Sequence, residues 1–91
     1  MKRDCGEGEL IPIKWEVVTC FGESDDEMIT KHPSFNSAKG VFDSLVVSAK
    51  TVPCSKIGLY AIDKHGYANC ILSFIHTKQG EFCIDDRTSE L

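Results

Sequence analysis

Thiols and imidazoles are the side chains of this sequence best suited to covalent or metal chemistry. They are Cys5, Cys20, Cys54, Cys70, Cys83, His32, His65 and His76. A cysteine beside a histidine base can act as a nucleophile, but no local catalytic signature accompanies any of them. No C-x-x-C or H-x-x-x-H spacing occurs either, so a closed zinc site is not expected. We predict no metal, no cofactor and no enzymatic activity, and keep a reactive cysteine such as Cys54 as the enzymatic alternative.

The cysteine count and the N-terminal residues bear on the cellular compartment. Five is an odd number of cysteines, which disfavours a disulfide framework. Asp4, Glu7 and Glu9 occupy the positions where a secretion signal needs an apolar run. Free thiols in a reducing cytoplasm are therefore predicted. The longest apolar run, residues 70–75, is far shorter than a bilayer span, so no membrane partner is expected.

Length and composition describe one small folded domain. The chain has 91 residues, of which 42% are hydrophobic and 26% charged, too apolar for a disordered chain. Its net charge is −4, and its lysines and arginines are scattered. Direct nucleic-acid binding is not expected, because such binding requires a basic stripe.

The hydrophobic pattern predicts a helix and several strands that must position these residues. Apolar residues three or four apart predict a helix over residues 34–50. Alternation and turn signals predict strands over residues 13–21, 27–32, 57–62, 67–76 and, as a short edge strand, 81–84. The fold class is therefore α+β: a mostly antiparallel sheet of four strands, or five with the edge strand, in the order β-β-α-β-β, with one helix on one face. Residues 1–12 and 85–91 are predicted to be loosely ordered.

Both faces of the predicted sheet are apolar. With a four-residue turn at residues 63–66, Ile62 pairs with Tyr67, and Leu59 shares the helix side with Cys70, Leu72 and Phe74. The opposite face then carries Val18, Cys20, Tyr60, Ile62, Tyr67, Asn69, Ile71 and Ile75. One helix covers one face only. The N-terminal lead, a second copy of the chain and a different protein all remain candidates to cover the other face.

A cluster of acids adds charge beside this face. Glu23, Asp25, Asp26 and Glu27 lie in one predicted turn, which would attract a basic partner over a long range. The predicted partner-binding residues are therefore Val18, Tyr60, Ile62, Tyr67, Ile71, Ile75, Glu23, Asp25, Asp26 and Glu27.

The order of these elements is similar to that of known inhibitors. The pattern begins with residues 15–19 (WEVVT) and the acidic turn. It continues with the helix pattern F-x-x-A-x-x-x-F-x-x-L from Phe35, and ends with residues 59–63 (LYAID) leading into residues 71–74 (ILSF). It resembles small accessory proteins of phages and mobile elements, including the anti-CRISPR type. The resemblance covers residues 13–76 and is one of architecture. It implies a protein that blocks a host defence nucleoprotein complex by steric or electrostatic contact in the host cytoplasm.

The sequence thus predicts a non-catalytic protein-binding module, with such an inhibitor as its most concrete form. A homodimeric structural or regulatory domain is the first alternative. A small cysteine-dependent enzyme is the second.

Overall fold

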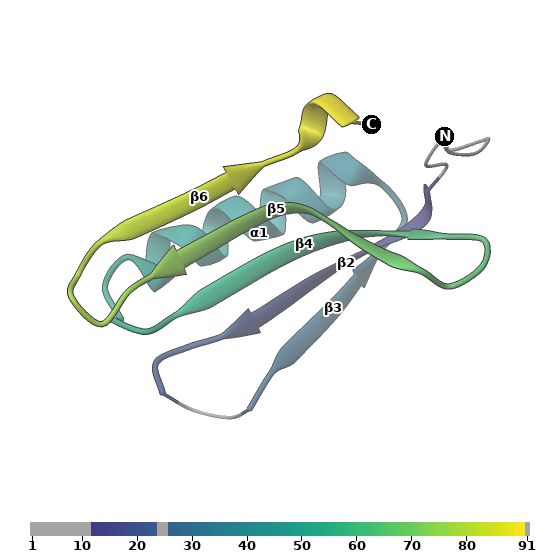
Figure 1. Cartoon of the computed structure of the whole chain (residues 1–91). Coiled ribbons are helices and arrows are strands. Elements are labelled where there is room, and N and C mark those ends of the chain that lie inside the picture. The colour runs from purple at the N-terminus through teal and green to yellow at the C-terminus, as the bar shows by residue number, and fades with distance from the viewer. Residues whose placement is uncertain (1–11, 24–25, 91) are drawn as a thin grey trace.

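Five antiparallel strands form a single sheet in the computed structural model, which describes residues 12–23 and 26–90 (Figure 1). The order across the sheet is β3-β2-β4-β5-β6. The strands are β2 (Pro12–Cys20), β3 (Met28–His32), β4 (Lys56–Asp63), β5 (Ala68–His76) and β6 (Phe82–Asp86). The predicted α+β class and antiparallel sheet are confirmed, and the fifth strand is present at the edge.

One α-helix of the described residues, α1 (Phe35–Ala49), crosses one face of the sheet (Figure 1). It begins after Ser34, whose Oγ accepts a hydrogen bond from the Ser37 N–H at 3.2 Å and so satisfies one unpaired donor of the first turn. The helix packs mainly against β4 and β2, with Ala38, Phe42 and Ala49 buried. Strand β6 lies beyond this cover, and each of its five residues is exposed.

The core lies between α1 and the central strands. Val17, Leu59 and Phe74 are each 0% exposed. They lie on one face because Val17 pairs with Leu59, and Leu59 pairs with Leu72, which is two residues before Phe74 in β5. Burying aliphatic and aromatic side chains of this size contributes about 1.5–3 kcal/mol each. This face is the one predicted to lie under the helix.

The hairpin between β4 and β5 has the predicted turn but a different register. The Asp63 carboxylate accepts hydrogen bonds from the N–H groups of His65 (2.8 Å) and Tyr67 (3.1 Å). Gly66 adopts a φ of +87°, which an L side chain rarely allows. The predicted pairing of Ile62 with Tyr67 is wrong, because Ile62 pairs with Ala68.

A bulge inside the β4–β5 ladder accounts for a second correction. Leu59 pairs with Leu72, whereas the next residue, Tyr60, pairs with Cys70. Ile71 is therefore an extra residue in β5, and it is buried in the core with 2% of its surface exposed. Cys70 and Ile71 have exchanged the faces that strict alternation assigns to them.

The C-terminal segment is more regular than predicted. Strand β6 continues to Asp86 and is followed by η1 (Thr88–Glu90), a turn of 3-10 helix. The Asp86 carboxylate accepts hydrogen bonds from the N–H (2.9 Å) and the Oγ1 (2.7 Å) of Thr88, and these bonds hold the pKa of that carboxyl below its usual range. Residues 1–11, also predicted to be loosely ordered, lie outside the described residues. Among the helices of the described residues, none has the length and apolar content to cross a membrane.

Candidate partner-binding groove

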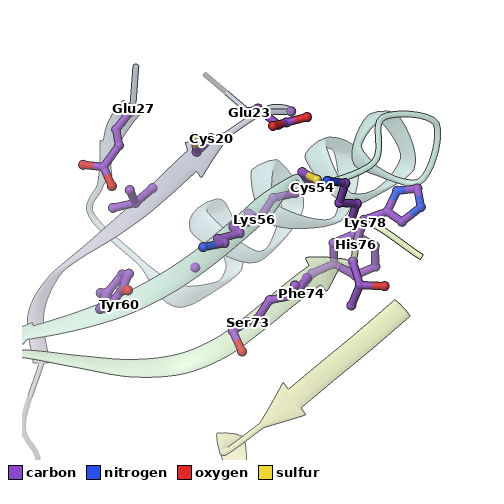
Figure 2. Close-up of a pocket in the computed structure, with 16 residues that line it drawn as sticks. Cys20, Glu23, Glu27, Cys54, Lys56, Tyr60, Ser73, Phe74, His76 and Lys78 are labelled. Atoms are coloured by element: carbon purple, nitrogen blue, oxygen red, sulfur yellow. The ribbon is translucent and has the colours of Figure 1, made fainter. Parts of the chain in front are cut away.

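The face of the sheet opposite α1 contains a groove with a volume of about 680 Å³ (Figure 2). It crosses strands β2, β4 and β5 and reaches the loops before β3 and before β4. We call it the open-face groove. Its apolar side chains come from alternate strand positions, such as Val18 on β2 and Ile75 on β5, because successive residues of a strand point to opposite faces.

Gly58 forms part of the groove floor, and the space that a side chain would take there is filled by the ring of Tyr60. Gly58 lies in the middle of β4, and the ring of Tyr60 leans back along the strand over it. A Cβ added at Gly58 would lie 2.7 Å from Cε1 of that ring and 3.2 Å from the phenol oxygen. An alanine there would therefore push the Tyr60 ring out of its place. Glycine inside a strand often marks such a close approach.

Tyr60 lines one side of the groove, and its partner on β5, Cys70, lies beside it. Partial burial raises the pKa of the Tyr60 phenol, and the nearby charges of Cys70 and Glu27 raise it further. Partial burial also raises the pKa of the Cys70 thiol, with a further contribution from Asp85. The thiol donates a hydrogen bond to the Leu72 carbonyl at 3.4 Å. Both groups are consequently neutral at pH 7, which suits contact with an apolar surface.

Charged side chains lie at the rim of the groove. Figure 2 shows Glu23 and Glu27 at the β2–β3 side, and Lys56 and Lys78 on the side of β4 and the loop that follows β5. Glu23, Asp26 and Glu27 are exposed. The groove therefore combines apolar side chains and a neutral tyrosine with acidic residues on the β2–β3 side and basic residues on the side of β4 and the loop after β5.

The structure brings five of the ten predicted partner-binding residues together. Val18, Tyr60, Ile75, Glu23 and Glu27 all line the open-face groove. Asp26 lies beside them in sequence on the exposed turn, and Asp25 falls outside the described residues.

Three predicted residues lie elsewhere. Ile62 and Ile71 are 5% and 2% exposed, so their side chains have almost no surface to offer a partner. Strict alternation places Ile71 on the open face, and the bulge in β5 moves it into the core. Tyr67 is 69% exposed, but it lies in the β4–β5 hairpin loop against the ring of His65 and does not line the groove.

Lys56, Gly58 and Ser73 line the groove and were missing from the sequence prediction. The available signal was Gly58, since a glycine within a strongly apolar strand indicates a gap or a close contact. Lys56 and Ser73 gave no signal, because a lysine at a strand end and a serine within a strand are common on solvated surfaces.

Cys54 and His76 also line the groove, without forming a nucleophile–base pair. The Nδ1 of His76 lies 2.9 Å from the Ala49 carbonyl, and its ring packs edge-on against Phe82. His76 thus ties the helix end to the sheet. Cys54 adopts a φ of +71°, and no hydrogen bond joins its thiol to a histidine in the described part of the chain. Residues 12–23 and 26–90 contain no group of three or more His, Cys, Asp or Glu side chains arranged to bind a metal.

No known protein family, curated protein or solved structure matches the chain.

Proposed function

We propose that this protein is a non-catalytic protein-binding module that contacts its partner through the open-face groove. The observation that supports this proposal is the composition of the groove: half-buried apolar side chains with a neutral tyrosine at one end, and charged side chains around them. Specific protein interfaces have this anatomy, with a desolvated centre and a polar rim. Tyrosine is also among the residues enriched at the energetic centres of interfaces.

The most specific form of the proposal is an inhibitor of a host defence nucleoprotein complex, acting by steric and electrostatic blocking. It is supported by the acidic side of the rim, where Glu23 and Glu27 lie next to the exposed Asp26. The chain as a whole carries a net charge of −4. An acidic surface accelerates association with a basic partner, and salt weakens that effect.

Affinity capture from a bacterial lysate, with identification of the bound proteins, tests the groove when matched variants are compared. Ile75→Glu places a charge in the groove at a position that is 37% exposed. Val47→Glu places the same charge on the exposed side of α1, where Val47 is 69% exposed. We expect Ile75→Glu to abolish capture of a specific partner and Val47→Glu to retain it, with thermal unfolding confirming that both variants fold. Equal capture by the two variants would remove the groove from the proposal.

The inhibitor form has its own test. Glu23→Lys with Glu27→Lys reverses the acidic side of the rim without changing the apolar centre. We expect this double variant to bind a basic nucleoprotein more slowly than the wild type at low salt, with the difference shrinking as salt is added. Identical association rates would exclude electrostatic blocking while leaving the apolar groove as a binding surface.

A further inference from the structure

Strand β6 leaves one row of backbone groups directed away from the sheet. The Arg87 N–H donates to the Ile71 carbonyl at 2.7 Å, and the Thr77 N–H donates to the Glu81 carbonyl at 2.8 Å. In an antiparallel ladder, residues alternate between directing their backbone groups toward one neighbour and toward the other. Since residues 81 and 87 face β5, Phe82, Ile84 and Asp86 direct their N–H and C=O groups to the outer edge. Within the described residues, β6 is the last strand on this side of the sheet.

The side chains of β6 do not protect this edge. Phe82 and Ile84 are 50% and 67% exposed on the helix side, just beyond the cover of α1. Edge strands often carry charged side chains, lysine above all, or proline to prevent pairing with another chain. The opposite edge strand, β3, contains Lys31 and His32, whereas β6 (FCIDD) has no lysine or proline and its charges are confined to Asp85 and Asp86 at one end. The β6 edge is thus the one suited to strand addition.

The charges around β6 are complementary to those of the same strand running in the opposite direction. If Ile84 pairs with Ile84 of a second copy, Glu81 lies opposite Arg87 of that copy, and this attraction occurs twice. Phe82 is then opposite Asp86 of the second copy. The Lys50 Nζ lies 5.9 Å from the centroid of the Phe82 ring, so a cation and an anion meet on the helix side as well. Centring the pair on Cys83 instead places Glu81 opposite Asp85, which is repulsive, and centring it on Asp85 opposes two aspartates.

From this self-complementary edge we infer that the chain forms a homodimer by antiparallel pairing of β6 with β6, centred on Ile84. The two-fold axis joins the five strands of each copy into one continuous sheet. Both helices lie on the same face, and Phe82 and Ile84 of the two copies form one apolar row between them. The open-face grooves stay on the opposite face and remain accessible.

Sedimentation equilibrium in the presence of a reducing agent tests the dimer directly, because the reductant excludes a disulfide through Cys83. The wild type is expected to move from the 10.1 kDa mass of one chain toward twice that mass as its concentration rises to about 1 mM, the range of weak interfaces. Ile84→Lys places two cations face to face at the centre and should remain monomeric. The matched control Ile29→Lys changes a 54% exposed residue of β3 and should dimerise like the wild type.

A charge exchange tests the register. Glu81→Arg alone places an arginine at residue 81 opposite Arg87 of the other copy, at both ends of the interface. This repulsion should raise the dissociation constant of the dimer about tenfold. Adding Arg87→Glu restores opposite charges across the edge and should return the dissociation constant to near that of the wild type. A general loss of stability would not be rescued in this way.

Three results would overturn the inference. A wild type that stays monomeric up to about 1 mM would show that the edge is blocked, for instance by another segment of the same chain, or does not self-pair. A dimer that survives Ile84→Lys but not Ile29→Lys would place the contact on β3. If adding Arg87→Glu does not restore the dimer weakened by Glu81→Arg, the register centred on Ile84 is excluded. Partner capture through the groove is measured with different variants, so the two proposals can fail separately.

Discussion

Val17 and Val18 are adjacent in β2, yet one is completely buried and the other lines a groove. The same division runs through the sheet: on β4, Leu59 faces α1 with 0% exposure, whereas Tyr60 on the other face is half-buried. The two faces also differ in composition, because the open face carries charged and small residues, such as Lys56, Gly58 and Ser73, among its apolar ones. The helix therefore covers the more apolar face, and the other face keeps its apolar side chains between polar neighbours.

The contrast between the faces also separates stability from binding. The helix side contains the large, fully buried side chains, so substitutions there should act on the free energy of unfolding. The open face keeps apolar side chains at partial exposure, so substitutions there should act mainly on contacts with other molecules.

The largest expected difference is between Leu59→Ala and Ile75→Ala. Leu59→Ala removes a fully buried side chain and should lower the free energy of unfolding by about 2–5 kcal/mol. Ile75 is 37% exposed, and its truncation should cost about 1 kcal/mol or less. Urea unfolding monitored by circular dichroism measures both. Equal losses would mean that the two faces are buried alike, and the contrast between them would be wrong.

A smaller effect is expected from a hydroxyl on the helix side. Thr19 is 1% exposed, and its Oγ1 has no hydrogen-bond partner among residues 12–23 and 26–90. Thr19→Val keeps the shape of the side chain and removes the unpaired polar atom, so it should raise the free energy of unfolding by about 1 kcal/mol. The matched change Val18→Thr, at the next position on the half-buried open face, should alter it by only about 0.5 kcal/mol. A destabilised Thr19→Val would show that this hydroxyl has a partner after all.

The smallest expected effect is a pH dependence that arises on the open face. The pKa values of Tyr60 and Cys70 are raised above their ordinary values of 10.0 and 9.0, first of all by burial. Both groups are harder to ionise in the folded than in the unfolded chain. Their contribution to stability is therefore complete below pH 9 and is lost as the pH rises through the raised values.

Unfolding by urea at pH 7 and at steps above pH 9 measures this loss. Tyr60→Phe combined with Cys70→Ala should lose less stability over that interval than the wild type does. A double variant with the same alkaline loss as the wild type would assign that loss to other groups.

Much of the fold could be predicted from sequence because local signals agreed with the tertiary structure. The helix pattern and the Asp63–Gly66 turn each specify local geometry, and each is present. The antiparallel pairing of β4 with β5 was also predictable, but its register was not, because the predicted register places Leu59 opposite Cys70 and the structure pairs Leu59 with Leu72.

The groove could be predicted only in part. Val18, Tyr60 and Ile75 were assigned to the open face because strands alternate, and the acidic turn follows β2 directly in sequence. The bulge at Ile71 depends on the pairing of β5 with β4, which one strand's pattern does not contain. The packing of Tyr60 over Gly58 depends on the rotamer of the tyrosine, which the sequence does not specify. The offset of α1 from β6, which leaves Phe82 exposed, likewise depends on how the helix is placed across the sheet.

The bulge at Ile71 has a consequence for how the hairpin tolerates change in length. Tyr60 and the residues nearer the turn follow one pairing offset, and Leu59 and the residues before it follow another, as Ile62 with Ala68 and Leu59 with Leu72 demonstrate. A change of one residue in the loop at residues 64–67 can be absorbed where the offset switches, before it reaches Gly58. The loop is therefore a suitable position for attaching a label or a short tag, since Tyr60 is the one groove-lining residue of β4 and β5 on the turn side of that switch.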